Sequence, residues 1–182
     1  MLTELQKRKL TVAFQHNDMD HDGYLARNDY EEYARRICEA LGFAPGSPEH
    51  DALYAQTVAA WDTDMLRAFD RDGDNRVSLE EHLAAYDVSL HDPALHNRLM
   101  TEYAGSVLKL WDRDGDGKLS SADYAVLLDC YGVPAKTASE AFAHLDRDGD
   151  GYLSTAECLK AVEEFFLSDD PAAPGNWLLG PY

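Results

Sequence analysis

The sequence predicts an all-α protein in which four helix–loop–helix units form two pairs within one compact globule, with short β-bridges between paired loops. Three observations support this prediction. A twelve-residue acidic loop recurs four times, apolar residues at helical spacing flank the loops, and the eighth residue of every loop is apolar. The length of 182 residues, with 45% hydrophobic and 27% charged residues, fits one compact domain or two small ones.

The predicted helices follow from apolar stripes on either side of the loops. Thr3 and Gln6 form a capping box that opens the first helix. Further along, apolar residues recur at the i, i+3, i+4 and i+7 spacing that places them on one helical face. These residues are Leu10, Ala13, Phe14, Tyr30, Tyr33, Ala34 and Ile37 around the first loop, Ala104, Val107, Leu108, Trp111, Tyr124, Leu127, Leu128 and Tyr131 around the third, and Ala138, Ala141, Phe142, Leu145, Cys158, Ala161, Val162 and Phe165 around the fourth.

The four loops span residues 18–29, 70–81, 112–123 and 146–157. They read DMDHDGYLARND, DRDGDNRVSLEE, DRDGDGKLSSAD and DRDGDGYLSTAE, which is the EF-hand pattern. Alternate residues of such a loop point short carboxylates inward, position 7 offers a backbone carbonyl, and the acid at position 12 reaches back from the exiting helix. Calcium is a hard cation that prefers six to eight oxygen ligands, so this spacing suits it.

The predicted metal ligands are the residues at positions 1, 3, 5, 7 and 12 of each loop. They are Asp18, Asp20, Asp22, Tyr24 and Asp29 in the first loop, Asp70, Asp72, Asp74, Arg76 and Glu81 in the second, Asp112, Asp114, Asp116, Lys118 and Asp123 in the third, and Asp146, Asp148, Asp150, Tyr152 and Glu157 in the fourth. The apolar residues at position 8 are expected to form the backbone bridge between paired loops. They are Leu25, Val77, Leu119 and Leu153.

The loops differ in ways that affect selectivity for the ion. Asp29 and Asp123 close the first and third loops with a side chain one methylene shorter than Glu, which shifts these sites towards Mg²⁺. The second loop has all its ligands but carries Asn75 where a sharp bend with positive φ is needed. Asn adopts that conformation at a modest cost, so we expect weakened binding there. The alternative is a metal-free loop retained for packing.

The domain boundaries follow from the loop pairing and from Pro/Gly-rich stretches. We expect an N-terminal pair over residues 1–90, a C-terminal pair over 91–167 and an apolar tail over 168–182. The stretches 42–51, 89–95 and 132–136 are the predicted linkers.

Charge excludes several partners. With 34 acidic against 16 basic residues and a net charge of −18, the chain should repel nucleic acid and anionic lipid and attract cations.

The N-terminus lacks a secretory signal, and no apolar run is long enough to cross a bilayer. Cys38, Cys130 and Cys158 are expected as reduced thiols on helices. We therefore expect a cytoplasmic protein, and we expect it to be a monomer.

Beyond the general EF-hand pattern, the chain resembles the sarcoplasmic calcium-binding proteins, and most nearly their prokaryotic, calerythrin-like relatives. The resemblance rests on four hands, an inserted linker in the first pair, Asp at the end of two loops, and a Gly-Asn-Trp-Leu-Leu-Gly tail. It implies an all-helical single globule and a role in buffering Ca²⁺ and Mg²⁺. In that family the second loop is often degenerate, whereas here its ligands are complete.

Three functions are open from the sequence. A Ca²⁺/Mg²⁺ buffer binding three to four ions is favoured, because the apolar tail residues Trp177, Leu178, Leu179 and Tyr182 can fill the chain's own groove. The alternative structure for the tail is a disordered end. The second possible function is that of a calcium sensor that regulates a protein partner. An enzyme is the third and is disfavoured, since none of the histidines, including His16, His21, His82 and His144, lies in a catalytic motif.

Overall fold

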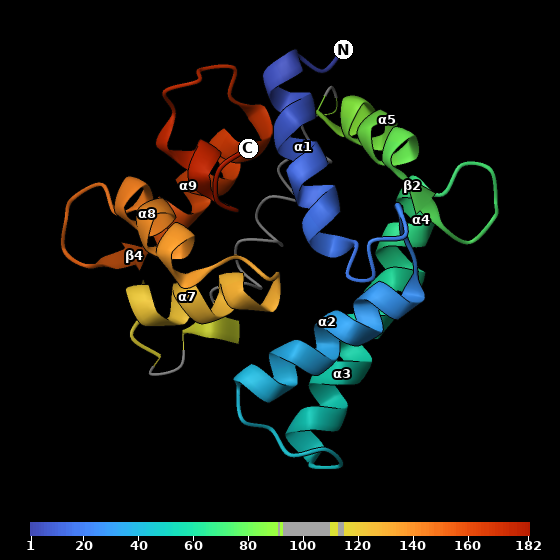
Figure 1. Cartoon of the computed structure of the whole chain (residues 1–182), viewed down its shortest axis with the longest axis horizontal. Coiled ribbons are helices and arrows are strands. Elements are labelled where there is room, and N and C mark those ends of the chain that lie inside the picture. Colours follow the sequence, from blue (N-terminus) through green and yellow to red (C-terminus); the bar gives the residue numbers. More distant parts are fainter. Residues whose placement is uncertain (91, 93–109, 113–114) are drawn as a thin grey trace. The chain divides into compact units, whose positions relative to one another are not determined.

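The computed structural model describes residues 1–90, 92, 110–112 and 115–182. In this part of the chain the helices are α1 (Glu4–Asn17), α2 (Arg27–Ala40), α3 (Pro48–Ala60), a π-helical turn η1 (Trp61–Met65), α4 (Leu66–Phe69), α5 (Leu79–Ser89), α7 (Ser121–Cys130), α8 (Ala135–Leu145), α9 (Thr155–Leu167) and a 3₁₀ turn η2 (Pro174–Trp177) (Figure 1). The strands are β1 (Tyr24–Leu25), β2 (Val77–Ser78), β3 (Lys118–Ser120) and β4 (Tyr152–Ser154). The all-α prediction with short bridging strands is confirmed.

The strands join the loops in the predicted pairs. Strand β1 pairs antiparallel with β2, and Leu25 lies opposite Val77. Strand β3 pairs antiparallel with β4, and Leu119 lies opposite Leu153. Each of these four position-8 side chains is at most 2% exposed, so the bridge also anchors each loop in the core.

The chain divides into two compact units. One consists of residues 13–86, and the other combines residues 1–12 with residues 87–182. Helix α1 thus contributes its first nine residues to one unit and its last five to the other. The boundaries 1–90, 91–167 and 168–182 remain a prediction. The apolar residues Ala104, Val107 and Leu108 and most of the linker 89–95 lie outside the described residues.

The core of the unit of residues 13–86 includes a cluster of six buried residues, which are Phe14, Leu25, Trp61, Phe69, Val77 and Ala85. Helices α2 and α3 lie side by side in it (Figure 1). The imidazole of His82 lies among the rings of Phe14, Phe69 and Tyr86, with centroid distances of 4.9–5.6 Å. This histidine is a core residue.

The predicted linker 42–51 is too long. Helix α3 already begins at Pro48, and the hydroxyl of Ser47 caps it by accepting a hydrogen bond from His50 N. Proline suits the first turn of a helix because its fixed φ is helical and its missing N–H would have no partner there. Ser47 and Pro48, which lie in the stretch predicted as a Pro/Gly-rich linker, therefore start a helix.

The other unit contains α7, α8, α9 and the tail. It also contains the start of α1, which begins with the predicted capping box: Gln6 Oε1 accepts from Thr3 N at 2.9 Å, and Thr3 Oγ1 accepts from Gln6 N at 3.3 Å. The tail is ordered and folds back on the helices. The ring of Trp177 stacks on His144 at 4.2 Å, and Tyr124 Oη donates to Leu178 O at 2.8 Å.

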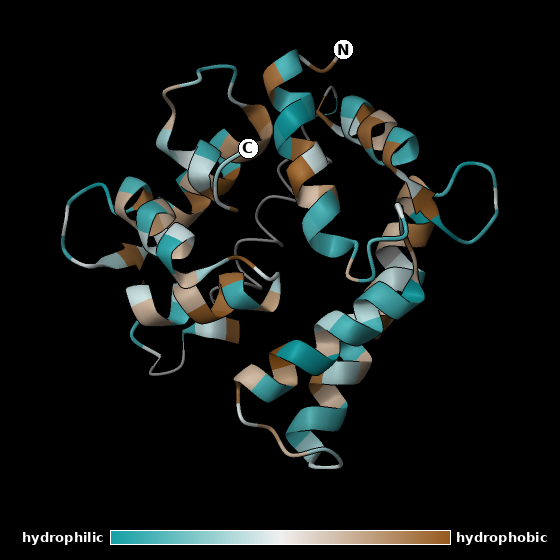
Figure 2. Ribbon diagram, viewed as in Figure 1, coloured by the Kyte–Doolittle hydropathy of each residue, from teal (hydrophilic) through white to brown (hydrophobic). Residues whose placement is uncertain are grey.

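Two further features bear on the predictions. The three cysteines are buried thiols on α2, α7 and α9, and none of them is in a disulfide, as expected. Within the described part of the chain, no helix combines the length and apolarity needed to span a membrane. The segments between α4 and β2 and between α8 and β4 are coloured teal to white, without the brown of apolar residues that the helices show (Figure 2).

Candidate metal centre

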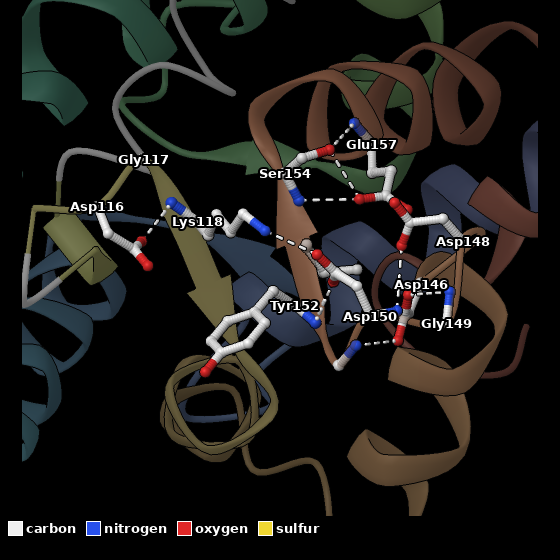
Figure 3. A network of polar contacts seen from close by, with 12 residues as sticks. Asp116, Gly117, Lys118, Asp146, Asp148, Gly149, Asp150, Tyr152, Ser154 and Glu157 are labelled. Carbon is white, nitrogen blue, oxygen red and sulfur yellow. Dashed lines mark hydrogen bonds and ion pairs between the residues drawn. The ribbon is translucent and has the colours of Figure 1, made fainter.

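The fourth loop shows how the sequence builds an oxygen cluster. Carboxylate oxygens of Asp146, Asp148 and Glu157 lie within 4.8 Å of one another. Backbone amides keep the loop wound around them: Asp146 accepts from Gly149 N and Gly151 N at 2.8 and 2.9 Å, and Asp150 accepts from Tyr152 N at 2.9 Å (Figure 3). Carboxylates gathered this closely repel one another, so the arrangement favours a bound cation.

The position-12 glutamate is oriented by both ends of the loop. Glu157 accepts from Arg147 N at 2.8 Å and from Ser154 N at 2.9 Å, while Ser154 Oγ caps α9 by accepting from Glu157 N. Burial alone would raise the pKa of Glu157, but hydrogen bonds to its carboxylate from the Ser154 hydroxyl and from the backbone N–H groups of the loop lower the pKa below its usual value. The exiting helix thus presents an ionised carboxylate to the loop.

The second loop forms an equivalent cluster. Oxygens of Asp70, Asp72 and Glu81 lie within 4.8 Å of one another. Asn75 adopts a φ of 64°, which is the left-handed conformation the sequence required of it, and its N–H donates to Asp70 Oδ2 at 3.1 Å. Burial would raise the pKa of Glu81, but hydrogen bonds from Ser78 and from the backbone lower it to about 2. The substitution of Gly by Asn therefore leaves the loop fully wound.

The first loop clusters differently. Oxygens of Asp18, Asp20 and Asp22 lie within 4.8 Å of one another, and Asp29 is not part of this group. Asp29 instead accepts from Met19 N and Ala26 N, each at 2.8 Å, and burial raises its pKa. Its shorter side chain reaches the loop backbone, as Glu157 does, but it does not join the other carboxylates.

The third loop is described in part. Asp112 accepts from Gly115 N and Gly117 N, each at 2.8 Å, and Asp116 accepts from Lys118 N at 2.8 Å. Ser120 Oγ donates to Asp123 Oδ2. Asp114 lies outside the described residues. The described half of the loop therefore has the same winding as the fourth loop.

Basic side chains contact two of the predicted ligands, which the sequence pattern did not indicate. Lys118 extends from β3 to Asp150 of the neighbouring loop, with 2.7 Å between Nζ and Oδ2 (Figure 3). Arg76 lies 3.2 Å from Asp74 and over the ring of Tyr24 at 4.0 Å. Both cations stand at position 7, where only the backbone carbonyl was assigned a role. The strand register that brings Lys118 to Asp150 is a tertiary feature.

Comparison with known proteins agrees with this geometry. A family model described as an EF-hand domain pair matches residues 63–86 and 129–164, which include the second and fourth loops. Sarcoplasmic calcium-binding proteins II, V, VI and VII of Branchiostoma lanceolatum are 29% identical over 90 residues, 49% of this chain and 48% of the relative. The matched region thus spans about half the length of that relative.

Solved structures extend the match to the whole chain. A Streptomyces coelicolor calcium-binding protein is 31% identical with a TM-score of 0.69, covering 88% of this chain and 97% of its own. A sarcoplasmic calcium-binding protein from amphioxus (20% identity) and a coelenterazine-binding protein from Renilla muelleri (24%) share the fold, each with a TM-score of 0.74 over 100% of both chains. Four acidic loops, paired by short strands and matched by these relatives, lead to one conclusion: the chain belongs to the EF-hand family of calcium-binding proteins, and it is similar to the sarcoplasmic calcium-binding proteins.

Proposed function

We propose that the protein is an intracellular buffer for Ca²⁺ and Mg²⁺ that binds three to four ions in its acidic loops. The carboxylates at positions 1, 3, 5 and 12 and the carbonyls of Tyr24, Arg76, Lys118 and Tyr152 are the ligands in this proposal. Its main support for metal binding is the approach of three carboxylates to within 4.8 Å of one another in the first, second and fourth loops. The family is defined by metal binding, and the proposal includes no catalysed reaction.

The ions are expected to differ between loops. The second and fourth loops end in Glu, whose carboxylate joins the cluster, and this favours the larger coordination number of Ca²⁺. The first and third end in Asp29 and Asp123, and the separation of Asp29 from its cluster supports a site with fewer protein oxygens. Mg²⁺ takes six ligands and retains several waters, so it competes best in these two loops.

The occupied groove supports the buffer over a sensor. A sensor exposes an apolar groove to a target when it binds calcium. Here the chain's own Leu178 and Leu179 line an apolar pocket together with residues of α7, β4 and α9, and the space left in this pocket measures about 30 Å³. That volume holds only about two or three water molecules. A tethered segment has a high effective concentration at its groove, so an outside peptide competes poorly.

The alternative is a sensor that regulates a protein partner. It is favoured by the 31% identity to the Streptomyces coelicolor protein, whose structure is described as a basis for prokaryotic calcium-mediated regulation. A hydrophobic dye titrated with calcium distinguishes the two functions. A buffer with a filled groove gives no calcium-dependent increase in dye fluorescence, whereas a sensor gives a saturable increase that follows occupancy of the loops.

A further inference from the structure

The C-terminal tail approaches α9 so closely that only glycine fits at the contact. A Cβ atom at Gly175 would lie 2.5 Å from Glu164 Cβ and 2.6 Å from Ala161 O. The Gly175 N–H donates to Glu164 Oε2 at 2.8 Å, so the same residue makes both the steric and the polar contact. The position of the Glu164 carboxylate therefore affects whether the tail can dock.

The carboxylate of Glu164 is in turn positioned by the fourth loop. Arg147, at position 2 of that loop, donates from Nη2 to Glu164 Oε2 at 2.6 Å. Its backbone N–H donates to Glu157 Oε1, the carboxylate that closes the loop. A continuous series of contacts thus runs from Glu157 through Arg147 and Glu164 to Gly175.

This ion pair is shorter than the other contact of Glu164, in which Lys160 Nζ lies 4.0 Å from Glu164 Oε1, and it is less exposed than the Lys160–Glu163 pair on the same helix. The side chain of Glu164 is 13% exposed and that of Arg147 33%, whereas Lys160 and Glu163 pair on the surface with about half of each side chain exposed. Exposed pairs contribute little because water screens them, while a partly buried pair is screened less. The Arg147–Glu164 pair is therefore able to transmit a change in the loop to the tail.

We propose that Arg147 and Glu164 are positioning residues that couple metal binding in the fourth loop to docking of the C-terminal tail. The inference rests on the proposed function of that loop. A metal ion that holds Glu157 against the start of the loop also holds Arg147 beside α9, and this orients Glu164 to accept from Gly175 N. Because coupling between two sites is reciprocal, a docked tail strengthens metal binding in the fourth loop by the same factor.

A second anchor keeps the tail close whatever the state of the loop. Lys9 Nζ donates to Glu164 O, Ser168 O and Asn176 Oδ1, each at 2.9 Å, and none of these atoms belongs to the loop. Metal binding therefore changes the position of the tethered tail over only a short distance. It requires no dissociation of the tail from the molecule.

The test compares three variants of the full chain. Glu164→Gln keeps a carbonyl oxygen for Gly175 N but removes the ion pair with Arg147. Gly175→Ala displaces the tail and leaves the ion pair in place. Glu163→Gln is the matched control, because it removes the same charge from the next residue of α9, where the side chain is 52% exposed. Calorimetric calcium titration measures the affinity of the fourth loop, and hydrogen exchange of residues 173–180 measures tail docking.

The coupling predicts a specific pattern. In the wild type, calcium slows tail exchange by about 5-fold or more, the lower end of typical coupling factors. Glu164→Gln and Gly175→Ala both lose this slowing and bind calcium in the fourth loop about 5-fold or more weakly, while Glu163→Gln behaves as the wild type. A thermal melt in excess calcium checks that each variant folds.

Two results would overturn the coupling and are distinguishable. If Glu164→Gln has the same calcium affinity and the same rate of tail hydrogen exchange as Glu163→Gln, metal binding by the loop is independent of tail docking. A fourth variant, Glu157→Gln, removes the carboxylate that closes the fourth loop. If it binds as many ions as the wild type and with the same affinities, the fourth loop is not a site, and the proposed function fails there together with the coupling.

Discussion

The backbone angle of Asn75 is expected to affect the affinity of the second loop for its ion. It adopts a φ of 64° where the first, third and fourth loops have glycine, with φ of 81–89°. A non-glycine residue pays up to about 1–2 kcal/mol for the left-handed conformation, and Asn pays less than most. The loop is wound as the motif requires, and we expect the conformational cost to appear as a lower affinity for the ion.

Replacement of Asn75 by glycine should therefore tighten the second loop. We expect the calcium affinity of that site to rise by up to about ten-fold, which corresponds to about 1.4 kcal/mol. Calorimetric titration of Asn75→Gly beside the wild type measures this change. Asn75→Ala, which lacks the tolerance of Asn for positive φ, should weaken the same site. Equal affinities in all three proteins would show that the angle does not limit binding.

Lys9 gives the fold a pH dependence. It is completely buried, and burial lowers the pKa of its ammonium to about 8, against the opposing effect of Asp169 and Glu164. Between pH 8 and the unfolded pKa near 10.4, the unfolded chain binds a proton that the folded chain has released. The penalty for burying the charge is thus largest below pH 8 and is relieved as pH rises through this window.

The wild type should therefore gain stability relative to Lys9→Met as pH rises from 8 to 10.5, by up to about 3 kcal/mol. Urea unfolding in saturating calcium at several pH values measures the difference. Lys7→Met is the control, because Lys7 is an exposed residue of the same helix that pairs with Glu4. A difference between wild type and Lys9→Met that stays constant with pH would contradict the assigned pKa.

At the level of single elements, the loops were predictable because each is specified within twelve residues. The positive φ of position 6, the bridge at position 8 and the capping box of Thr3 and Gln6 all depend on neighbours close in sequence. The start of α3 at Pro48 was missed because Pro and Gly nearby were interpreted by composition, although Ser47 followed by Pro48 is a helix-start signal.

Other features depend on tertiary contacts and have no local signature. The contact of Lys118 with Asp150 requires the register of β3 with β4, and the Arg147–Glu164 pair joins residues 17 positions apart. The π-helical turn at Trp61–Met65 also interrupts a segment that reads as continuous helix. Apolar residues in the tail were recognisable, but the glycine that fits against α9 was identified only from the structure.

The residue at position 12 should set the selectivity of a whole loop. Asp123→Glu lengthens the closing side chain of the third loop by one methylene, so that both oxygens reach the ion and favour the higher coordination number of Ca²⁺. We expect calcium affinity at that loop to rise by about ten-fold and competition by Mg²⁺ to weaken. Calcium titrations with and without magnesium measure both effects. An unchanged ratio of the two affinities would show that position 12 does not set selectivity here.

At the scale of the whole molecule, charge links folding to metal binding. The net charge is −18, and the predicted ligands concentrate acids in four short loops. Without metal these carboxylates repel one another, and each bound Ca²⁺ adds two positive charges where the repulsion is strongest. An ion that binds only the folded chain stabilises it by mass action.

Removal of metal should therefore lower the melting temperature substantially. One site saturated at a thousand times its Kd contributes about 4 kcal/mol. For a chain of this size, that corresponds to a shift of roughly 10 °C. Thermal unfolding in excess calcium and in excess chelator measures the shift. Melting curves that coincide would mean that the loops bind too weakly to matter for the fold.

The most direct test counts bound ions. Equilibrium dialysis against a saturating excess of Ca²⁺, followed by metal analysis of the retained protein, gives the number of ions per chain. The account predicts three to four. A protein that retains no calcium under these conditions would contradict it.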